Sequence, residues 1–360
     1  MKISFVLDTF GGGGKERRCL QLIQGLNKQG YYDIQVIIIN DDAAYSEIYD
    51  TSAQIHIIDR KNKELSLFET CKYVKKLFKS FNPDIVQTWG GISTLIPVLL
   101  KPFFKYKLIG AYVADADSPK ILSLDGLYPW YCDKIVGNSK VGLEAYRIPH
   151  SKRILIYNGF NEKRLECKIE KEGVKKSLGI DTDYVVAMIA TFWSNKDWGC
   201  YLQAAKSIVK KRNDITFLAI GGGPTWEAHN AMVEDDERSR IKMLGRRSDV
   251  DELIQICNVT VLVSLHGEGI SNSILESMAW GVPVIATNSG GTPEIISDGE
   301  TGLLLDENRV ELLEIKLLSL LDNKELLKSM SIKATAKVKS DFMLSVMTQR
   351  YINLYESFYS

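Results

Sequence analysis

The stretch EGISNSILESMAWGVPVIATNSGGTPEII covers residues 268–296 and predicts a loop, a helix, a strand, a Gly-Gly turn and a second helix. It holds two carboxylates, Glu268 and Glu276, that stand eight residues apart. Residues 258–264 before it read NVTVLVS, an apolar β-branched run typical of a buried parallel strand. Open α/β sheets bind ligands at the carboxyl ends of their strands, so we expect a binding site at residues 265–272.

The helix that follows this loop has the properties of an anion site. Ser271 or Asn272 can cap it, and the N–H groups of a helix start bind phosphate with help from the helix dipole. Glu276 lies about one turn into the helix, and helical side chains lean toward the N-terminus, so its carboxylate points back at the loop. A bound phosphate would repel this carboxylate, so we expect Glu276 to accept hydrogen bonds from sugar hydroxyls. Glu268, which lies outside the helix, could contact a second sugar. The alternative is two solvated glutamates beside an ordinary turn.

The whole segment resembles the E-x7-E region of retaining glycosyltransferases with the GT-B fold, in the large glycogen-synthase-like family (glycosyltransferase family 4). The family pattern continues through DGETGLL at residues 298–304. The resemblance implies an α/β chain with two Rossmann-like parallel-sheet domains that face a central cleft. It also implies that Glu268 is a catalytic residue that orients the donor sugar and that Glu276 binds the ribose of a nucleotide diphosphate sugar. The backbone amides that would bind the diphosphate belong to Gly269, Ile270, Ser271 and Asn272.

Strand and helix patterns alternate along the 360 residues, 45% of which are hydrophobic, and this content suits two α/β domains. A charged stretch at residues 161–176 interrupts the alternation and predicts a linker between a domain at 1–160 and a second domain at 161–341. A final helix at 342–360 returns to the first domain in the family that the chain resembles. Strands are predicted at 2–8, 34–39, 53–58, 84–88, 107–111, 133–139, 154–156, 184–190, 215–221, 241–245 and 258–264, and helices at 16–29, 64–81, 201–212 and 342–358.

Charge and cysteine usage exclude several classes of protein. The 45 basic and 45 acidic residues balance, so no global field attracts nucleic acid. Six cysteines are scattered without the spacing of a metal or redox site. The N-terminal stretch reads as a strand rather than a secretory signal. We therefore predict a cytoplasmic protein.

A glycine-rich turn, GGGGKER at residues 11–17, follows the first predicted strand. It fits neither a dinucleotide fingerprint nor a phosphate-binding P-loop. It resembles the GG-x-E-R turn of the family, which implies that Gly13 and Gly14 face the donor phosphates and that Lys15 lies on the acceptor side. A plain tight turn is the alternative.

Lys196 aligns with the lysine that holds the donor diphosphate in the family pattern, and an ammonium there would stabilise the leaving group. The pattern places an arginine where this chain has Thr191, so one cation is missing. The family segment that contacts the nucleobase corresponds to residues 245–250, so we predict that Arg246 or Arg247 contacts the donor.

Two D-x-D sequences, Asp115-Ala116-Asp117 and Asp181-Thr182-Asp183, match the metal signature of the other glycosyltransferase architecture. A chain with two similar halves does not fit that architecture, so we predict no metal and no cofactor besides the substrate. Many family members carry a histidine near the first copy, but this chain has none between His56 and His150. Asp115 or Asp117 is therefore the candidate for binding an acceptor hydroxyl.

A basic amphipathic pattern at residues 71–81 and further lysines and aromatics at 101–107 suit either an anionic membrane surface or a sheet-covering helix with its lysines in water. Taken together, the resemblance implies a retaining, metal-independent transferase. It would transfer a sugar to a glycan or lipid-linked acceptor in bacterial surface polysaccharide assembly. The donor would be a UDP-sugar, the commonest in such enzymes, or a GDP-sugar, the next commonest. The alternatives are a pseudo-glycosyltransferase that binds nucleotide-sugar or glycan beside a partner enzyme, and a GT-B epimerase of sugar nucleotides.

Overall fold

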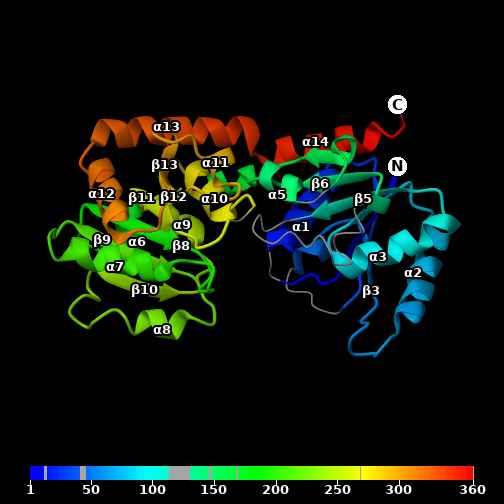
Figure 1. Cartoon of the computed structure of the whole chain (residues 1–360), viewed down its shortest axis with the longest axis horizontal. Coiled ribbons are helices and arrows are strands. Elements are labelled where there is room, and N and C mark those ends of the chain that lie inside the picture. The colour runs from blue at the N-terminus through cyan, green and yellow to red at the C-terminus, as the bar shows by residue number, and fades with distance from the viewer. Residues whose placement is uncertain are drawn as a thin grey trace. The chain divides into compact units, whose positions relative to one another are not determined.

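The computed structural model describes residues 1–11, 14–40, 46–112, 130–145, 148–167, 169–267 and 269–359. Its contacts divide the chain into two compact units (Figure 1). The first unit consists of Met1–Gly159 and Leu344–Ser360, and the second consists of Phe160–Met343. Each unit is built around a parallel sheet, so the prediction of two parallel-sheet α/β domains is confirmed.

The first unit contains a seven-stranded sheet in the order β3-β2-β1-β4-β5-β6-β7, and its neighbouring strands pair in parallel. β1 and the strands beside it are buried and rich in Ile and Val, as expected for a sheet covered on both faces. The strands are β1 (Lys2–Leu7), β2 (Asp33–Ile38), β3 (Gln54–Ile57), β4 (Ile85–Thr88), β5 (Lys107–Tyr112), β6 (Lys134–Gly137) and β7 (Arg153–Leu155).

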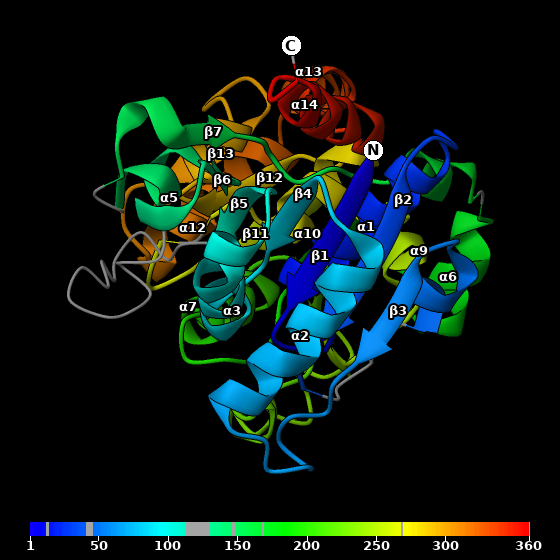
Figure 2. The same ribbon diagram turned by 90° about the vertical axis from the view of Figure 1, so that its right-hand side faces the viewer.

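Two hydrophobic clusters lie on the two faces of this sheet. One contains residues of α1 (Gly14–Asn27) and α14 (Leu344–Glu356), and the other contains residues of α2 (Leu67–Phe81), α3 (Gly91–Leu100) and α5 (Lys140–Ala145). Figure 2 shows α2 and α3 on their face of the sheet. The short 3-10 helices of this unit are η1 (Ser46–Asp50), η2 (Lys101–Phe103) and η3 (His150–Lys152).

The start of α2 differs from the prediction, which placed it at residue 64. Ser66 and Glu69 form a capping box, in which the Ser66 hydroxyl accepts from Glu69 N and the Glu69 carboxylate accepts from Ser66 N. This pairing satisfies two backbone donors and fixes the first helical residue at Leu67.

The last helix, α14, is fixed to the first unit by buried polar contacts. Tyr355 Oη donates to Gln87 Oε1 at 2.6 Å, and Arg18 Nη2 donates to Tyr351 Oη at 2.8 Å. A Cβ atom on Gly25 of α1 would lie within 2.9 Å of the Thr348 methyl carbon, so the two helices need this glycine to pack closely. The first unit is therefore completed by a segment that follows the second unit in sequence.

The second unit contains a six-stranded parallel sheet in the order β10-β9-β8-β11-β12-β13. The strand order reverses beside β8, because β9 and β10 lie on one side of it and β11 to β13 on the other. The strands are β8 (Tyr184–Ile189), β9 (Ile215–Ile220), β10 (Ile241–Gly245), β11 (Val259–Leu262), β12 (Val284–Thr287) and β13 (Gly302–Leu305).

Helices cover both faces of this second sheet. One face packs against a cluster that includes residues of α6 (Lys171–Ser177) and α9 (Val250–Gln255), and α10 (Asn272–Ala279) contacts α9 on the same side. α7 (Trp198–Val209) and α12 (Val310–Leu321) contact each other and strands of the sheet. α13 (Lys324–Asp341) packs on α10 and α12. The remaining helices are η4 (Glu162–Glu166), α8 (Trp226–Asn230) and α11 (Thr292–Ile295).

The described residues of the charged stretch predicted as a linker form η4 and α6, and the contacts group this stretch with the second unit. Val174 and Leu178 pack against the core while the lysines around them lie outside it. The dense charge of residues 161–176 masks this short apolar stripe in the sequence.

No helix within the described residues is both long enough and apolar enough to span a bilayer.

Candidate functional site

The loops after β8 and β11 meet at the point where the strand order of the second sheet reverses. Ligands of doubly wound sheets bind at such a point, outside the carboxyl ends of the strands. Lys196, after β8, forms an antiparallel bridge with Ser264, after β11. Asp197 N donates to Val263 O at 3.0 Å, and Leu265 N donates to Asn195 O at 2.9 Å. The two loops therefore form one rigid edge beside the residues predicted to bind the donor.

Lys196 is buried at this edge, with 8% of its surface exposed. Its Nζ donates to Ser264 Oγ at 3.2 Å. Ser264 is fixed in turn, because its N donates to Thr287 Oγ1 at 3.0 Å and Asn308 Nδ2 donates to its carbonyl oxygen at 2.9 Å. The ammonium is thus held in place by strands β11 and β12 and the segment after β13. Ser264 and Asn308 were not identified from the sequence.

An aromatic stack fixes the turn that carries Lys196. The ring of Phe192 lies parallel to the ring of Trp198, with centroids 3.8 Å apart, and Trp198 meets Tyr201 edge to face. Trp198 Nε1 also donates to the carbonyl oxygen of Thr191 at 3.1 Å. Asp197 accepts from Cys200 N at 3.0 Å and starts α7 at Trp198, three residues earlier than predicted. Thr191 is exposed at the position where the family pattern has an arginine.

α10 begins beside this edge with Ser271 at its N-cap position. The Ser271 side chain makes no capping hydrogen bond and instead contacts Ser273 Oγ at 3.1 Å. The predicted cap is therefore absent, although Ser271 stands at the right position. Asn272 is the first residue of α10, and Gly269 and Ile270 lie in the loop just before its N-cap. Glu268 lies outside the described residues.

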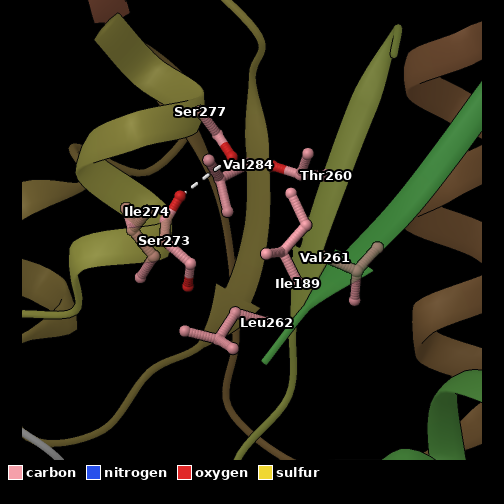
Figure 3. A pocket seen from close by; sticks show the side chains of 8 residues that line it. All are labelled: Ile189, Thr260, Val261, Leu262, Ser273, Ile274, Ser277 and Val284. Carbon is pink, nitrogen blue, oxygen red and sulfur yellow. Dashed lines mark hydrogen bonds between the residues drawn. The ribbon is translucent and has the colours of Figure 1, made fainter. Parts of the chain in front are cut away.

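A small pocket lies under α10 rather than at its start (Figure 3). Figure 3 shows the hydroxyl groups of Thr260, Ser273 and Ser277 among aliphatic side chains of the sheet. Ser277 Oγ donates to the carbonyl oxygen of Ser273, and Thr260 Oγ1 has no hydrogen-bond partner among the described residues. This space separates α10 from β11 and is distinct from the loop edge that holds Lys196.

Glu276 is part of an ion-pair network. Arg164 Nη1 donates to Glu276 Oε1 at 2.7 Å. Arg164 Nε and Nη2 donate to the two carboxylate oxygens of Asp251 at 2.8 and 2.7 Å. Trp280 Nε1 donates to Asp251 Oδ1 at 2.9 Å. The network joins η4, α9 and α10, and it places a cation against the carboxylate that the sequence assigns to ribose binding.

Burial alone would lower the pKa of Arg164, but the hydrogen bonds to Asp251 and the charge of Glu276 outweigh it and raise the pKa. The guanidinium therefore stays charged. Sequence reasoning missed Arg164 because it lies in the charged stretch taken for a linker, 112 residues from Glu276.

The structure distinguishes Arg246 from Arg247. Arg247 makes a two-bond contact with Asp249, at 2.8 and 2.5 Å, which raises the pKa of Arg247 and lowers that of Asp249. Arg246 is exposed and has no ion-pair partner among the residues that the structure describes. Its Cβ atom lies 3.3 Å from where a Cβ of Gly222 would stand, so it lies against the glycine loop after β9. Of the two arginines, Arg246 is the one available to a ligand.

The remaining predicted residues lie in or near the first unit. Gly14 is the first residue of α1, at the carboxyl end of β1, and Lys15 contacts Glu16 at 3.5 Å. Gly13, Asp115 and Asp117 lie outside the described residues.

The second D-x-D copy, Asp181 and Asp183, precedes β8, so it lies at the amino ends of the strands and away from the site. Within the described part of the chain, no three His, Cys, Asp or Glu residues group as metal ligands do.

Models of two protein families match this chain. The model described as "Glycosyl transferases group 1" matches residues 170–337, and the model described as "Glycosyl transferase 4-like" matches residues 11–98. The first match contains Lys196, Arg246 and the whole of α10.

Individual relatives agree with these models. The N-acetyl-alpha-D-glucosaminyl L-malate synthase of Bacillus anthracis is 30% identical over 206 residues, which are 56% of this chain and 52% of that protein. The chain spans only 42–61% of the length of this and three further curated relatives. The UDP-Gal:alpha-D-GlcNAc-diphosphoundecaprenol alpha-1,3-galactosyltransferase of Escherichia coli is 27% identical, with 95% of this chain and 93% of that protein covered.

Solved structures show the same fold. HepE from Anabaena, in complex with UDP, superposes with a TM-score of 0.86 at 18% identity, with 99% of this chain and 100% of that chain covered. The outer core galactosyltransferase WaaB superposes with a TM-score of 0.76 at 16% identity, with 99% of each chain covered. The chain therefore belongs to the glycosyltransferases of family 4 and has the GT-B fold.

Proposed function

We propose that the chain transfers a sugar from a nucleotide diphosphate sugar, most simply a UDP-sugar, to a glycan or lipid-linked acceptor in bacterial surface polysaccharide assembly. The observation that carries the proposal is the fixed position of Lys196 on Ser264, at the edge where α10 begins. A buried ammonium beside a helix start is suited to an anionic leaving group. The relative from E. coli is named for a UDP-Gal donor and a diphosphoundecaprenol acceptor.

In this proposal the anomeric carbon–oxygen bond to the diphosphate breaks as the bond to the acceptor oxygen forms on the same face. The departing diphosphate moves toward Lys196 and the backbone amides of residues 269–272, and one of its oxygens takes the acceptor proton. Glu268 orients the donor sugar through its hydroxyls, Glu276 binds the ribose, and Arg246 contacts the nucleotide. The product then keeps the anomeric configuration of the donor.

A ligand that binds only the folded state raises its stability, so thermal shift against a panel of nucleotide sugars identifies the donor. We expect a UDP-sugar to raise the Tm more than the matching GDP-sugar. Incubating that donor with a lipid-linked acceptor and reading the anomeric proton coupling by NMR then tests retention. A panel in which no nucleotide sugar shifts the Tm would contradict the proposal, and a product of inverted configuration would contradict the mechanism.

We also propose that the reaction needs no metal ion, because Lys196 and the helix start can offset the charge of the leaving diphosphate. Activity should therefore survive chelation by EDTA. Loss of activity that manganese restores would assign a metal role and direct attention to Asp115 and Asp117.

The first unit carries a surface that suits an anionic bilayer. Residues 66–107 contain seven lysines and two acidic residues in a chain of zero net charge. Phe68, Tyr73 and Phe103 are 68, 53 and 63% exposed. Lys72 Nζ lies 4.5 Å from the ring centroid of Phe68 and Lys75 Nζ lies 3.8 Å from the ring centroid of Phe103, so cations and exposed aromatic rings lie next to one another. Such a surface combines attraction to anionic headgroups with aromatic insertion.

We propose that this surface rests on the anionic leaflet that holds a lipid-linked acceptor. Co-sedimentation with phosphatidylglycerol vesicles should exceed that with phosphatidylcholine vesicles and should fall in a Lys72→Glu/Lys75→Glu variant. A Lys328→Glu/Lys339→Glu variant, which alters exposed lysines of α13, controls for net charge. Equal loss of binding in the two variants would contradict a role for this surface.

A further inference from the structure

We propose that Arg164 is a positioning residue that holds Glu276 in the orientation that reads the ribose of the donor nucleotide. The proposal rests on the proposed function, because it takes from it the contact between Glu276 and ribose. Arg164 lies outside the sequence motifs that carry the family resemblance. The structure assigns it this role through the 2.7 Å contact between its Nη1 and Glu276 Oε1.

Arg164 is itself held rigidly. Its planar guanidinium meets both oxygens of Asp251, and this two-bond geometry fixes the plane of the group as well as its position. Asp251 is anchored by Trp280 Nε1, and the guanidinium carbon lies 4.9 Å from the ring centroid of Phe160. One remaining arm of the fork is directed at Glu276. A carboxylate on a flexible side chain thereby acquires a defined orientation before any ligand arrives.

The network also offsets the negative charge of Glu276. Glu276 lies about one turn from the helix start where the diphosphate is proposed to bind, and an uncompensated carboxylate there would repel it. The side chains of Arg164, Asp251 and Glu276 are 18, 22 and 11% exposed, so solvent screens their charges only in part. The Arg164 guanidinium in contact with Glu276 offsets its charge. The carboxylate can then accept from hydroxyls beside an anionic ligand.

A purely structural ion pair that ties η4 to α9 would explain the Asp251 contact without any role for ribose. Comparing UDP with 2′,3′-dideoxy-UDP separates the two readings. The two nucleotides differ only in the ribose hydroxyls, so the ratio of their Kd values reports the hydroxyl contacts alone. A general loss of stability in a variant weakens both nucleotides together and leaves the ratio unchanged.

The experiment measures both Kd values by calorimetry for the wild-type chain and three variants. We expect the wild type to prefer UDP by about tenfold or more. Arg164→Gln should bring the ratio close to one, and Arg164→Lys, which keeps the charge but not the fork, should restore part of it. Arg212→Gln is the matched control, because Arg212 makes the same two-bond contact with Asp214 and a further contact with Asp322 in the same unit. It should leave the ratio at the wild-type value.

The outcomes are distinguishable. A wild-type ratio of one would refute the ribose role of Glu276 and the Arg164 proposal with it. A wild-type preference that survives Arg164→Gln would refute the Arg164 proposal alone. Should Arg164→Gln fail to fold, Trp280→Phe removes only the bond that anchors Asp251 and keeps an aromatic ring in place. That variant should still lower the ratio, and an unchanged ratio there would also overturn the proposal.

Discussion

Replacing Glu276 with alanine should weaken nucleotide binding and should cost the fold less stability than replacing Arg164. The change removes one of the three side-chain hydrogen bonds that Arg164 makes among the described residues, and it leaves the two to Asp251 in place. A hydrogen bond to a charged group contributes about 1.5–3 kcal/mol, so the loss of this contact should lower the unfolding free energy by about that amount. Removing Arg164 instead leaves two partly buried carboxylates without their cation, and this should cost about 3–5 kcal/mol.

The loss of ribose contacts in the Glu276→Ala variant should cost about 1–3 kcal/mol of binding, or roughly 5- to 150-fold in Kd. Calorimetric titration with UDP measures it directly. Glu314→Ala is the matched control, because Glu314 is also a partly buried, ion-paired glutamate of the second unit, bonded to Lys211 and Ser207. It should lose stability without losing affinity. Unchanged UDP affinity in Glu276→Ala would refute the ribose assignment.

Three further predictions follow from the same structure. Lys196→Met should lower kcat/KM by about 10²–10³-fold, because it removes charge stabilisation of the leaving diphosphate, and steady-state kinetics would show an unchanged rate if the residue had no such role. Gly221→Ala should lower the unfolding free energy by at least about 1–3 kcal/mol. Gly221 has a φ of 152°, and a Cβ atom there would overlap the carbonyl oxygen of Ala190. Urea unfolding measures the change, and an unchanged midpoint would contradict the prediction. The hydrogen bond from Arg212 lowers the pKa of Asp214, so this pair stabilises the fold fully above the ordinary carboxyl pKa of about 4. The contribution is lost as the pH falls below that value toward the lowered pKa. Asp214→Asn should therefore reduce the unfolding free energy at pH 7 more than at pH 3, and equal losses at the two pH values would contradict the assignment.

Local sequence patterns were sufficient to predict most strands of the two sheets and the start of α10, but β13 was not predicted as a strand. The buried strands are continuous apolar runs, such as residues 215–220, that need no tertiary information to identify. The motif at residues 268–296 combines a loop, a helix and a strand, and the spacing of these elements alone indicates how they follow one another. For the same reason, the sequence placed Lys196 and α10 at the carboxyl ends of two strands.

Contacts between distant segments were beyond such reasoning. Arg164 pairs with a residue 87 positions away and another 112 positions away, and nothing in its charged surroundings distinguishes it from solvated lysines. Ser264 and Lys196 are 68 residues apart, and only the strand order brings them together. Helix boundaries set by side-chain caps also differed from the prediction. The start of α7 at Trp198 is an example, because an aspartate in a loop and one at an N-cap, such as Asp197, look alike in sequence.

The helix α14 has a consequence for how the chain is made. On the ribosome, residues 1–159 emerge first, but Tyr351 and Tyr355 follow only after all of residues 160–343. At about 5–20 residues per second, the nascent first unit waits roughly 10–40 s for the helix that covers Arg18 and Gln87. During translation its unfinished apolar face is a natural target for chaperones, and a chain ending before residue 344 would keep that face exposed.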